Sequence, residues 1–223
     1  MATLENPRLP EPPPGESVRL SNISWDVYLA LRNENEHRNL RLTYDRGFLE
    51  IMSPSKRHER VAYLLGRLID VWTEARGLTV QACRTTTFQR KDLDRALEPD
   101  NCYYIEHEPQ VRNRDRLDLK IDPPPDLIVE VDLRSPSLDR LPIYAAMGAP
   151  EVWLWRREQI LVYRLSGAEY EVREASQALP GFPIGQAAEL LSRRLESDDN
   201  ALVRTFRSLI SAGPESGAGQ GSA

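Results

Sequence analysis

The sequence predicts an α/β domain with a mixed central β-sheet that is flanked by helices. Strand-like and helical patterns are interspersed along the chain, and residues 127–131 form a run apolar enough to be covered on both faces of a sheet. The 223 residues suit one domain with a sizeable core. Apolar residues make up 40% and charged residues 28%, as in ordinary globular proteins.

The two ends of the chain predict no fixed fold. Residues 1–18 hold a proline-rich stretch, which is typical of an extended segment. Residues 212–223 are small and polar. We therefore expect the domain at residues 19–211, with the chemistry inside it.

Helix and hairpin signals mark the first part of this domain. Ser24 is a candidate N-cap for a short amphipathic helix that begins at Trp25. Residues 40–52 predict two strands that are joined by an Asp-Arg-Gly turn. The strongest helical pattern follows, because Ser55 offers a cap, apolar residues recur at helical spacing and Gly77 supplies the stop.

Shorter strands surround the most charged part of the chain. Residues 78–89 predict one or two strands. Residues 97–105 predict another, opened by Pro99 and Asp100, because proline is tolerated at the first residue of a strand. Residues 106–120 are so rich in charge that we expect a solvated loop.

The apolar strand predicted at residues 126–133 is followed by a short helix. A Ser-Pro-Ser sequence ends the strand, and either Ser137 or Asp139 is the expected cap of the helix. Gly148 is expected to end that helix. Further strands and two closing helices are predicted, in this order, at residues 151–165, 169–173, 185–195 and 201–210.

One face of the apolar strand at residues 126–133 carries carboxylates. Side chains alternate along a strand, so Asp126, Glu130 and Asp132 share one face while the opposite face is apolar. Gathering such charges in a low-dielectric interior costs several kcal/mol apiece unless positive charge lies among them. A divalent cation is the simplest partner, so we expect one there.

Four segments, in this order along the chain, resemble the Uma family of predicted restriction endonucleases, within the PD-(D/E)XK superfamily. They are RLTYDRGFLEIMSPSKRHERV, TTTFQRKDLDRALEPDNCYYI, PPPDLIVEVDLRSPSLDRLPIYAAMGAPEVWLW and LPGFPI. The resemblance covers roughly Trp25 to Ile210. It implies a restriction endonuclease-like fold with additional terminal hairpins and helices, and hydrolysis of DNA phosphodiester bonds with Mg²⁺ or Mn²⁺. A homodimer is compatible with it.

The resemblance also implies a set of site residues. It makes Asp100 and Glu130 the metal-binding acids, and Glu59 an auxiliary acid at the start of the long helix. The superfamily pattern would place lysine where this chain has Asp132. In similar family members a lysine occurs early in the next helix, and Arg140 stands at the matching place. Arginine can offset charge on a phosphate, but it stays protonated and is a poor base.

Simpler interpretations stay open for these residues. Glu130 could pair with an arginine, and Asp100 alone is typical of a turn. Glu59 could be a solvated acid in the first turn of a helix. Asp132 could be a third ligand or could hydrogen-bond the following turn. His58 aligns with the apolar stripe, where a hydrogen-bonded core-edge histidine is the usual explanation.

Net charge and cysteine content limit which partners and which cellular compartment the sequence predicts. The net charge of −5 gives no global basic field for tight non-specific DNA binding, although a local basic cleft is compatible with it. With Asp132 at the lysine position, this charge favours a rival function, a catalytically inactive nuclease fold that binds nucleic acid or protein. Two isolated cysteines and no signal sequence predict a reducing cytoplasm. No apolar run is long enough to predict a membrane span.

Overall fold

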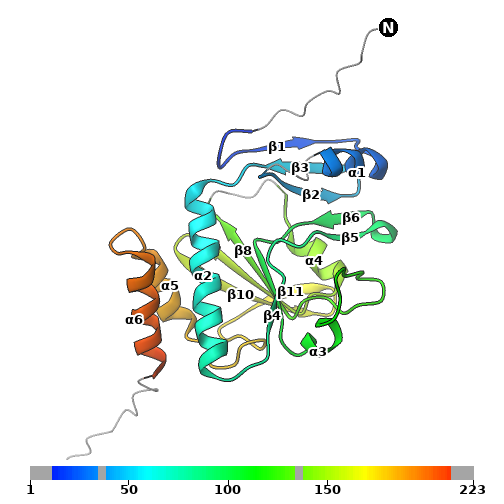
Figure 1. Cartoon of the computed structure of the whole chain (residues 1–223). Helices are drawn as coiled ribbons and strands as arrows, with labels where there is room; N and C mark the ends of the chain where they lie inside the picture. Colours follow the sequence, from blue (N-terminus) through cyan, green and yellow to red (C-terminus); the bar gives the residue numbers. More distant parts are fainter. Residues whose placement is uncertain (1–11, 35–38, 134–137, 212–223) are drawn as a thin grey trace, which may run out of the picture.

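The protein folds into two β-sheets with helices packed against them (Figure 1). The computed structural model describes residues 12–34, 39–133 and 138–211. The strands are β1 (Ser17–Leu20), β2 (Arg41–Asp45), β3 (Phe48–Met52), β4 (Gln81–Ala82), β5 (Phe88–Arg90), β6 (Arg95–Leu97), β7 (Asn101–Tyr104), β8 (Leu127–Asp132), β9 (Glu151–Arg156), β10 (Gln159–Ser166) and β11 (Glu169–Arg173). The helices are α1 (Trp25–Glu34), α2 (Lys56–Ala75), α3 (Glu108–Val111), α4 (Leu141–Met147), α5 (Ile184–Ser192) and α6 (Asp199–Ser211).

The larger sheet is mixed and holds β8, the apolar strand predicted from the sequence, near its centre. Its strand order is β11-β10-β9-β8-β7-β4. Only β8 and β9 pair in parallel; the other neighbours are antiparallel. A parallel pair needs a crossover connection, and the chain supplies one by passing from β8 through α4 to β9. The predicted mixed α/β architecture is therefore confirmed.

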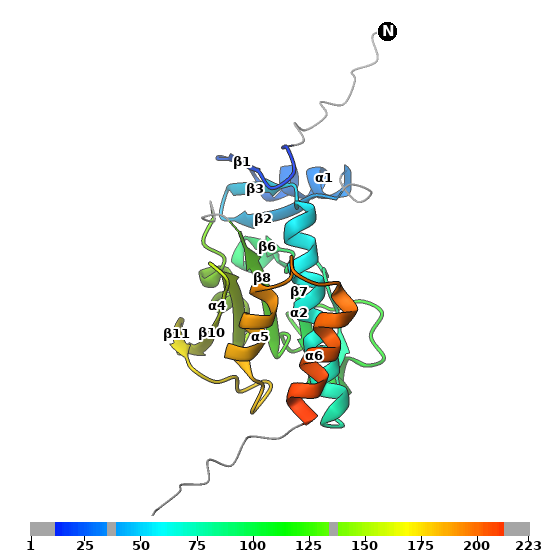
Figure 2. The same cartoon turned by 90° about the vertical axis from the view of Figure 1, so that its left-hand side faces the viewer.

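Helices cover this sheet on both faces, as the apolar run in β8 predicts. Leu127, Val129 and Val131 point to the face that packs against α2, α5 and α6, and all three are buried. Ile128 points the other way, into a second core that α4 completes. Figure 2 shows α2, α5 and α6 together in front of the sheet, with α4 set apart from them. Burial on both faces explains why the strand has so few polar side chains.

The smaller sheet has the order β1-β3-β2-β6-β5 and packs against α1. The predicted hairpin is confirmed as β2 and β3, joined by Arg46 and Gly47 with φ of 48° and 87°. Ser24 caps α1, since its Oγ accepts the N–H of Val27 at 3.4 Å. The expectation that residues 1–18 lack a fixed fold is wrong for Ser17 and Val18, which begin β1 and pair with β3. Residues 1–11 lie outside the described ranges.

The chain crosses between the two sheets in a way that positions Asp100. It leaves the larger sheet after β4, forms the β5–β6 pair in the smaller sheet, and returns to the larger sheet as β7 (Figure 1). Pro99 and Asp100 lie at this return, directly before β7. The predicted strand at residues 97–105 is thus split: its first residue ends β6, and its centre forms β7.

Two local predictions need correction. Residues 106–120 are not wholly a solvated loop, because α3 forms there with Val111 and Glu108 buried. The short helix after β8 has Arg140 as its N-cap residue, without a side-chain hydrogen bond at that position. Asp139 instead accepts the N–H of Leu141 at 3.1 Å, and the alternative cap Ser137 lies outside the described residues. No helix within the described ranges is long and apolar enough to cross a membrane.

Removal of the Ser55 cap should destabilise the protein modestly. Ser55 Oγ accepts the N–H of His58 at 3.2 Å and so satisfies one free donor at the start of α2. We expect Ser55→Ala to lower the free energy of unfolding by about 1 kcal/mol, measured by urea denaturation. Ser55→Asp retains an acceptor and should keep most of the stability. An equal loss in both variants would contradict a capping role.

Candidate functional site

A cavity of about 970 Å³ lies between the two sheets and the first turns of α2 and α4. It is bounded by β1 and β3 of the smaller sheet and by β8, β9 and β10 of the larger one. Its lining includes six charged or titratable side chains that matter below: Glu50, His58, Glu130, Asp132, Arg140 and Arg156. Side chains of both signs of charge thus line one cavity.

Asp100 and Glu130 come together beside this cavity, as predicted. The antiparallel register pairs Asn101 with Val129, so one position further along places Asp100 opposite Glu130. Opposed residues of neighbouring strands project to the same side of a sheet. Asp100 Oδ2 accepts a hydrogen bond from the backbone N–H of Val131 at 2.8 Å, which ties its carboxylate to β8. Each of the two acids is only 5% exposed.

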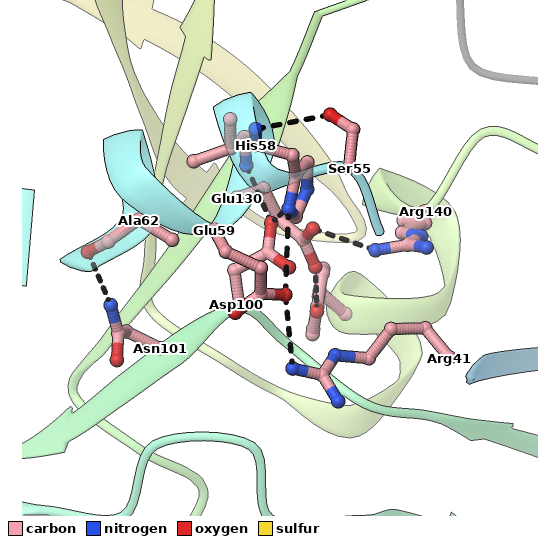
Figure 3. Close-up of polar contacts among 11 residues, drawn as sticks. Arg41, Ser55, His58, Glu59, Ala62, Asp100, Asn101, Glu130 and Arg140 are labelled. Atoms are coloured by element: carbon pink, nitrogen blue, oxygen red, sulfur yellow. Dashed lines mark hydrogen bonds and ion pairs between the residues drawn. The ribbon is translucent and has the colours of Figure 1, made fainter. Parts of the chain in front are cut away.

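The carboxylate of Glu130 is held by two residues of α4. Its Oε2 accepts a hydrogen bond from Arg140 Nη1 at 2.7 Å (Figure 3). Its Oε1 accepts a hydrogen bond from the hydroxyl of Tyr144. Burial raises the pKa of Glu130 to about 7, and the negative charge of Asp100 adds to that rise while Arg140 opposes it. Burial lowers the pKa of Arg140, but the nearby negative groups, Glu130 first among them, together raise it above the usual value. The guanidinium therefore stays charged.

Asp100 is paired with a buried histidine. His58 Nε2 lies 3.2 Å from Asp100 Oδ2, and the histidine is 6% exposed. The contact does not have the alignment of a hydrogen bond, so we treat it as an ion pair. Burial lowers the pKa of His58, yet Asp100 and, less strongly, Glu59 raise it to about 10. Burial likewise disfavours the Asp100 anion, but His58 lowers its pKa below the usual value. The ring is thus a cation at neutral pH.

The positive charge expected among the acids is supplied by the protein itself. Arg140 balances Glu130, and protonated His58 balances Asp100. This was the alternative left open for Glu130. Among the described residues, no group of three or more His, Cys, Asp or Glu side chains is arranged to hold a metal ion. The folded chain thus places a cation of its own beside each of the two acids.

The acids nevertheless have the chemistry of a divalent-ion site. Asp100 Oδ1 is buried and has no hydrogen-bond partner among the described residues, so one carboxylate oxygen is available. Mg²⁺ and Mn²⁺ prefer oxygen ligands from carboxylates. Glu130 could offer a second such oxygen if Arg140 released it. The residues present thus fit an ion, at the cost of one arginine contact.

The other two predicted acids lie at the margins of the site. Glu59 has a 44% exposed side chain, with its Oε1 3.6 Å from Arg41 and 3.8 Å from His58. Asp132 lines the cavity, and its Oδ2 lies 3.2 Å from Arg156 Nε on β9. Neither observation tests a catalytic role, so both roles stay predictions.

Sequence reasoning missed three residues of the site. His58 was assigned to the edge of the core, whereas its ring faces Asp100. Tyr144 follows Arg140 by one helical turn, a spacing that could have indicated a shared target. Glu50 is 5% exposed, and its charge helps to keep Arg140 protonated after the larger effect of Glu130. Glu50 interrupts an apolar strand run, which was the available signal.

The comparisons with known proteins place this site in a family. A solved structure, titled as a putative nuclease belonging to DUF820 from Anabaena variabilis ATCC 29413, is 19% identical and matches with a TM-score of 0.43. The match covers 74% of this chain and 90% of that chain. No curated protein matches the sequence. The family model Uma2, described as "Putative restriction endonuclease", matches residues 25–194. Because this range is well over half of the sequence, the chain belongs to the Uma2 family.

Proposed function

We propose that the protein is a metal-dependent endonuclease that hydrolyses phosphodiester bonds of DNA. The observation that carries the proposal is the placement of Asp100 opposite Glu130, which lines the cavity, with a buried oxygen of Asp100 that has no hydrogen-bond partner in the described part of the chain. Membership of a family described as restriction endonucleases supports it. The two acids come from neighbouring strands, so the sheet fixes their separation.

The side chains of the site have different proposed roles, which are to bind the ion, to orient its ligands and to bind the phosphate. Asp100 and Glu130 would hold the ion, which supplies an activated water and polarises the phosphate. His58 keeps Asp100 deprotonated and orients it through the 3.2 Å contact. Arg140 can shift from the carboxylate of Glu130 toward a phosphate, since guanidinium binds both groups through the same fork of donors. Glu59 is proposed as an auxiliary acid, and Asp132 as a further acid of the same cavity.

Three arginines of the cavity lining can contact a phosphate despite the acidic net charge. The cavity lining includes Arg57, Arg140 and Arg156, and these come from three separate elements around one opening. The same lining includes five acids, Glu16, Glu50, Glu130, Asp132 and Asp139, so the arginines would act as individual phosphate contacts and not as a net positive field. The net charge of −5 then limits non-specific binding elsewhere on the surface.

The purified protein is expected to nick supercoiled plasmid DNA when Mg²⁺ or Mn²⁺ is present and to leave it intact in EDTA. The physical reason is that a bound divalent ion lowers the pKa of the attacking water and polarises the phosphate. Agarose gel separation of supercoiled, nicked and linear forms measures the rate. A parallel preparation from cells that lack the chain controls for contaminating nucleases. Equal nicking in that control, or nicking that persists in EDTA, would contradict the proposal.

A second function is favoured by the contacts of Glu130. Both of its oxygens are engaged, by Arg140 and by Tyr144, and Asp132 is paired with Arg156. This arrangement suits a catalytically inactive nuclease fold that binds nucleic acid or protein. Calorimetric titration with Mn²⁺ separates the two functions, because only the nuclease requires an ion at these acids.

A cytoplasmic location and a homodimer are further proposals. Light scattering of the purified protein checks the homodimer.

A further inference from the structure

The only two cysteines of the chain, Cys83 and Cys102, face each other across neighbouring strands. β4 and β7 pair antiparallel, with Ala82 opposite Tyr103. The next pair in this register is Cys83 and Cys102, and the N–H of Cys83 donates to the carbonyl of Cys102 at 2.9 Å. The fold therefore brings together two residues that lie on either side of a long excursion into the other sheet.

This arrangement matches the geometry of a disulfide bond. Residues that form a hydrogen-bonded antiparallel pair have Cα atoms about 5.5 Å apart. Disulfides span Cα separations of about 4.4–6.8 Å. Directly opposed side chains also project to the same side of the sheet, so the two sulfur atoms can meet without backbone movement. The hydrogen bond from Cys102 lowers the pKa of Cys83, as expected for thiols in contact.

The two thiols differ in their access to solvent. Cys83 is partly exposed, whereas Cys102 is 0% exposed. Cys102 Sγ also donates to the carbonyl of Arg84 at 3.3 Å, which holds it on the side where Cys83 lies. An oxidant would therefore reach Cys83 first, with Cys102 already in place behind it.

We propose that Cys83 and Cys102 are a redox-modification site that forms a reversible disulfide on exposure to hydroperoxides. The thiolate of Cys83 attacks the peroxide, the O–O bond breaks, and an alcohol or water leaves as Cys83 becomes a sulfenic acid. The thiol of Cys102 then attacks that sulfur, the S–O bond breaks and water leaves. In sum, two thiols are oxidised by two electrons and one hydroperoxide is reduced.

The disulfide would close a loop that contains part of the proposed active site. Cys83 marks the point where the chain leaves the larger sheet, and Cys102 lies in β7, where the chain has returned. The enclosed segment includes β5, β6 and Asp100. Closing a loop of this size restricts the unfolded chain, so the oxidised protein should be the more stable form.

Graded hydrogen peroxide treatment of the full chain tests this inference. Both thiols should disappear together in a thiol assay, and the intact mass should fall by two hydrogen atoms. Trypsin should release residues 77–84 linked to residues 96–112, and dithiothreitol should reverse every change. The melting temperature of the oxidised protein is expected to rise by about 6–12 °C above that of the reduced protein.

Two variants assign the roles. Cys102→Ser should trap the sulfenic acid at Cys83, detected by dimedone, without the thermal shift. Cys83→Ser should resist the same peroxide dose. If either variant fails to fold, the wild-type peptide map decides alone. Wild-type protein that keeps both thiols, gains oxygen without linked peptides, or forms links between two chains overturns the proposal.

Discussion

Asp100→Asn is expected to reduce DNA nicking by at least about 100-fold while the protein keeps its fold. Asparagine has the shape of aspartate, and its carbonyl oxygen can still accept the N–H of Val131 that Asp100 Oδ2 accepts at 2.8 Å. The amide NH₂ then occupies the place of the buried, unpartnered Oδ1. An NH₂ group cannot bind a divalent ion, so the ion site is lost while the backbone contact is retained.

A matched control separates loss of the site from loss of a buried acid. Asp126 is also 5% exposed, and it accepts the backbone N–H groups of Ile105 and His107 at 2.6 and 3.0 Å. Both of its carboxylate oxygens have partners, since its Oδ1 also contacts His107 Nδ1, whereas Asp100 Oδ1 has none among the described residues. Asp126→Asn should therefore keep nicking within a fewfold of wild type, apart from any change in stability. Mn²⁺ affinity, measured by calorimetry, should fall only in Asp100→Asn. Equal nicking by the two variants would refute the assignment of Asp100 as a ligand.

Arg140→Met is expected to lower the free energy of unfolding by about 3–5 kcal/mol near pH 8, measured by urea denaturation in EDTA. Arg140 Nη1 lies 2.7 Å from Glu130 Oε2, and the two side chains are 15% and 7% exposed. Removing the guanidinium leaves an uncompensated carboxylate in the interior. Methionine fills a similar volume, so the loss reports mainly the charge and not a cavity.

The pH dependence of this loss has a defined sign. Burial already raises the pKa of Glu130 from 4.5 to about 7, and loss of Arg140 should raise it further. Below about pH 7 Glu130 keeps its proton in both folded proteins, but above that pH only the folded variant keeps a proton that the unfolded chain releases. Its stability therefore falls relative to wild type as pH rises from about 7 to 8. At pH 5 a protonated Glu130 carries no charge, and the loss should be smaller.

A double variant tests whether the effect belongs to the pair. Arg140→Met with Glu130→Gln leaves no charge at either position, so the combined loss should be smaller than the sum of the single losses by about 1–3 kcal/mol. Purely additive losses, or a loss that is the same at pH 5 and pH 8, would show that Arg140 acts through packing alone.

The sequence predicted the framework of the site better than its charges. β8 could be predicted because its run of apolar residues suits only a strand covered on both faces. The order of acids and the family resemblance then placed Asp100 beside Glu130. Their partners could not be predicted in the same way, because His58 and Arg140 reach the acids from two helices whose packing depends on the whole core. Periodicity assigned His58 to a buried face but could not tell what that face contacts.

Predictions made from local composition were wrong where a few contacts determine the structure. The segment at residues 106–120 is highly charged, yet burial of Val111 and the contact between Glu108 and Arg112 at 2.7 Å are enough for one helical turn. The N-terminal segment is rich in proline, yet β3 presents an open edge, and Ser17–Leu20 fills it by antiparallel pairing. Composition averaged over a stretch of sequence does not detect such single contacts.

The parallel pairing of β8 with β9 has an evolutionary consequence. Because the crossover leads from β8 to α4, the basic group over Glu130 is carried by the start of α4 and not by either strand of the parallel pair. Relatives could thus exchange this basic group by a substitution at the start of the helix, while the hydrogen-bonded ladder of the sheet stays unchanged.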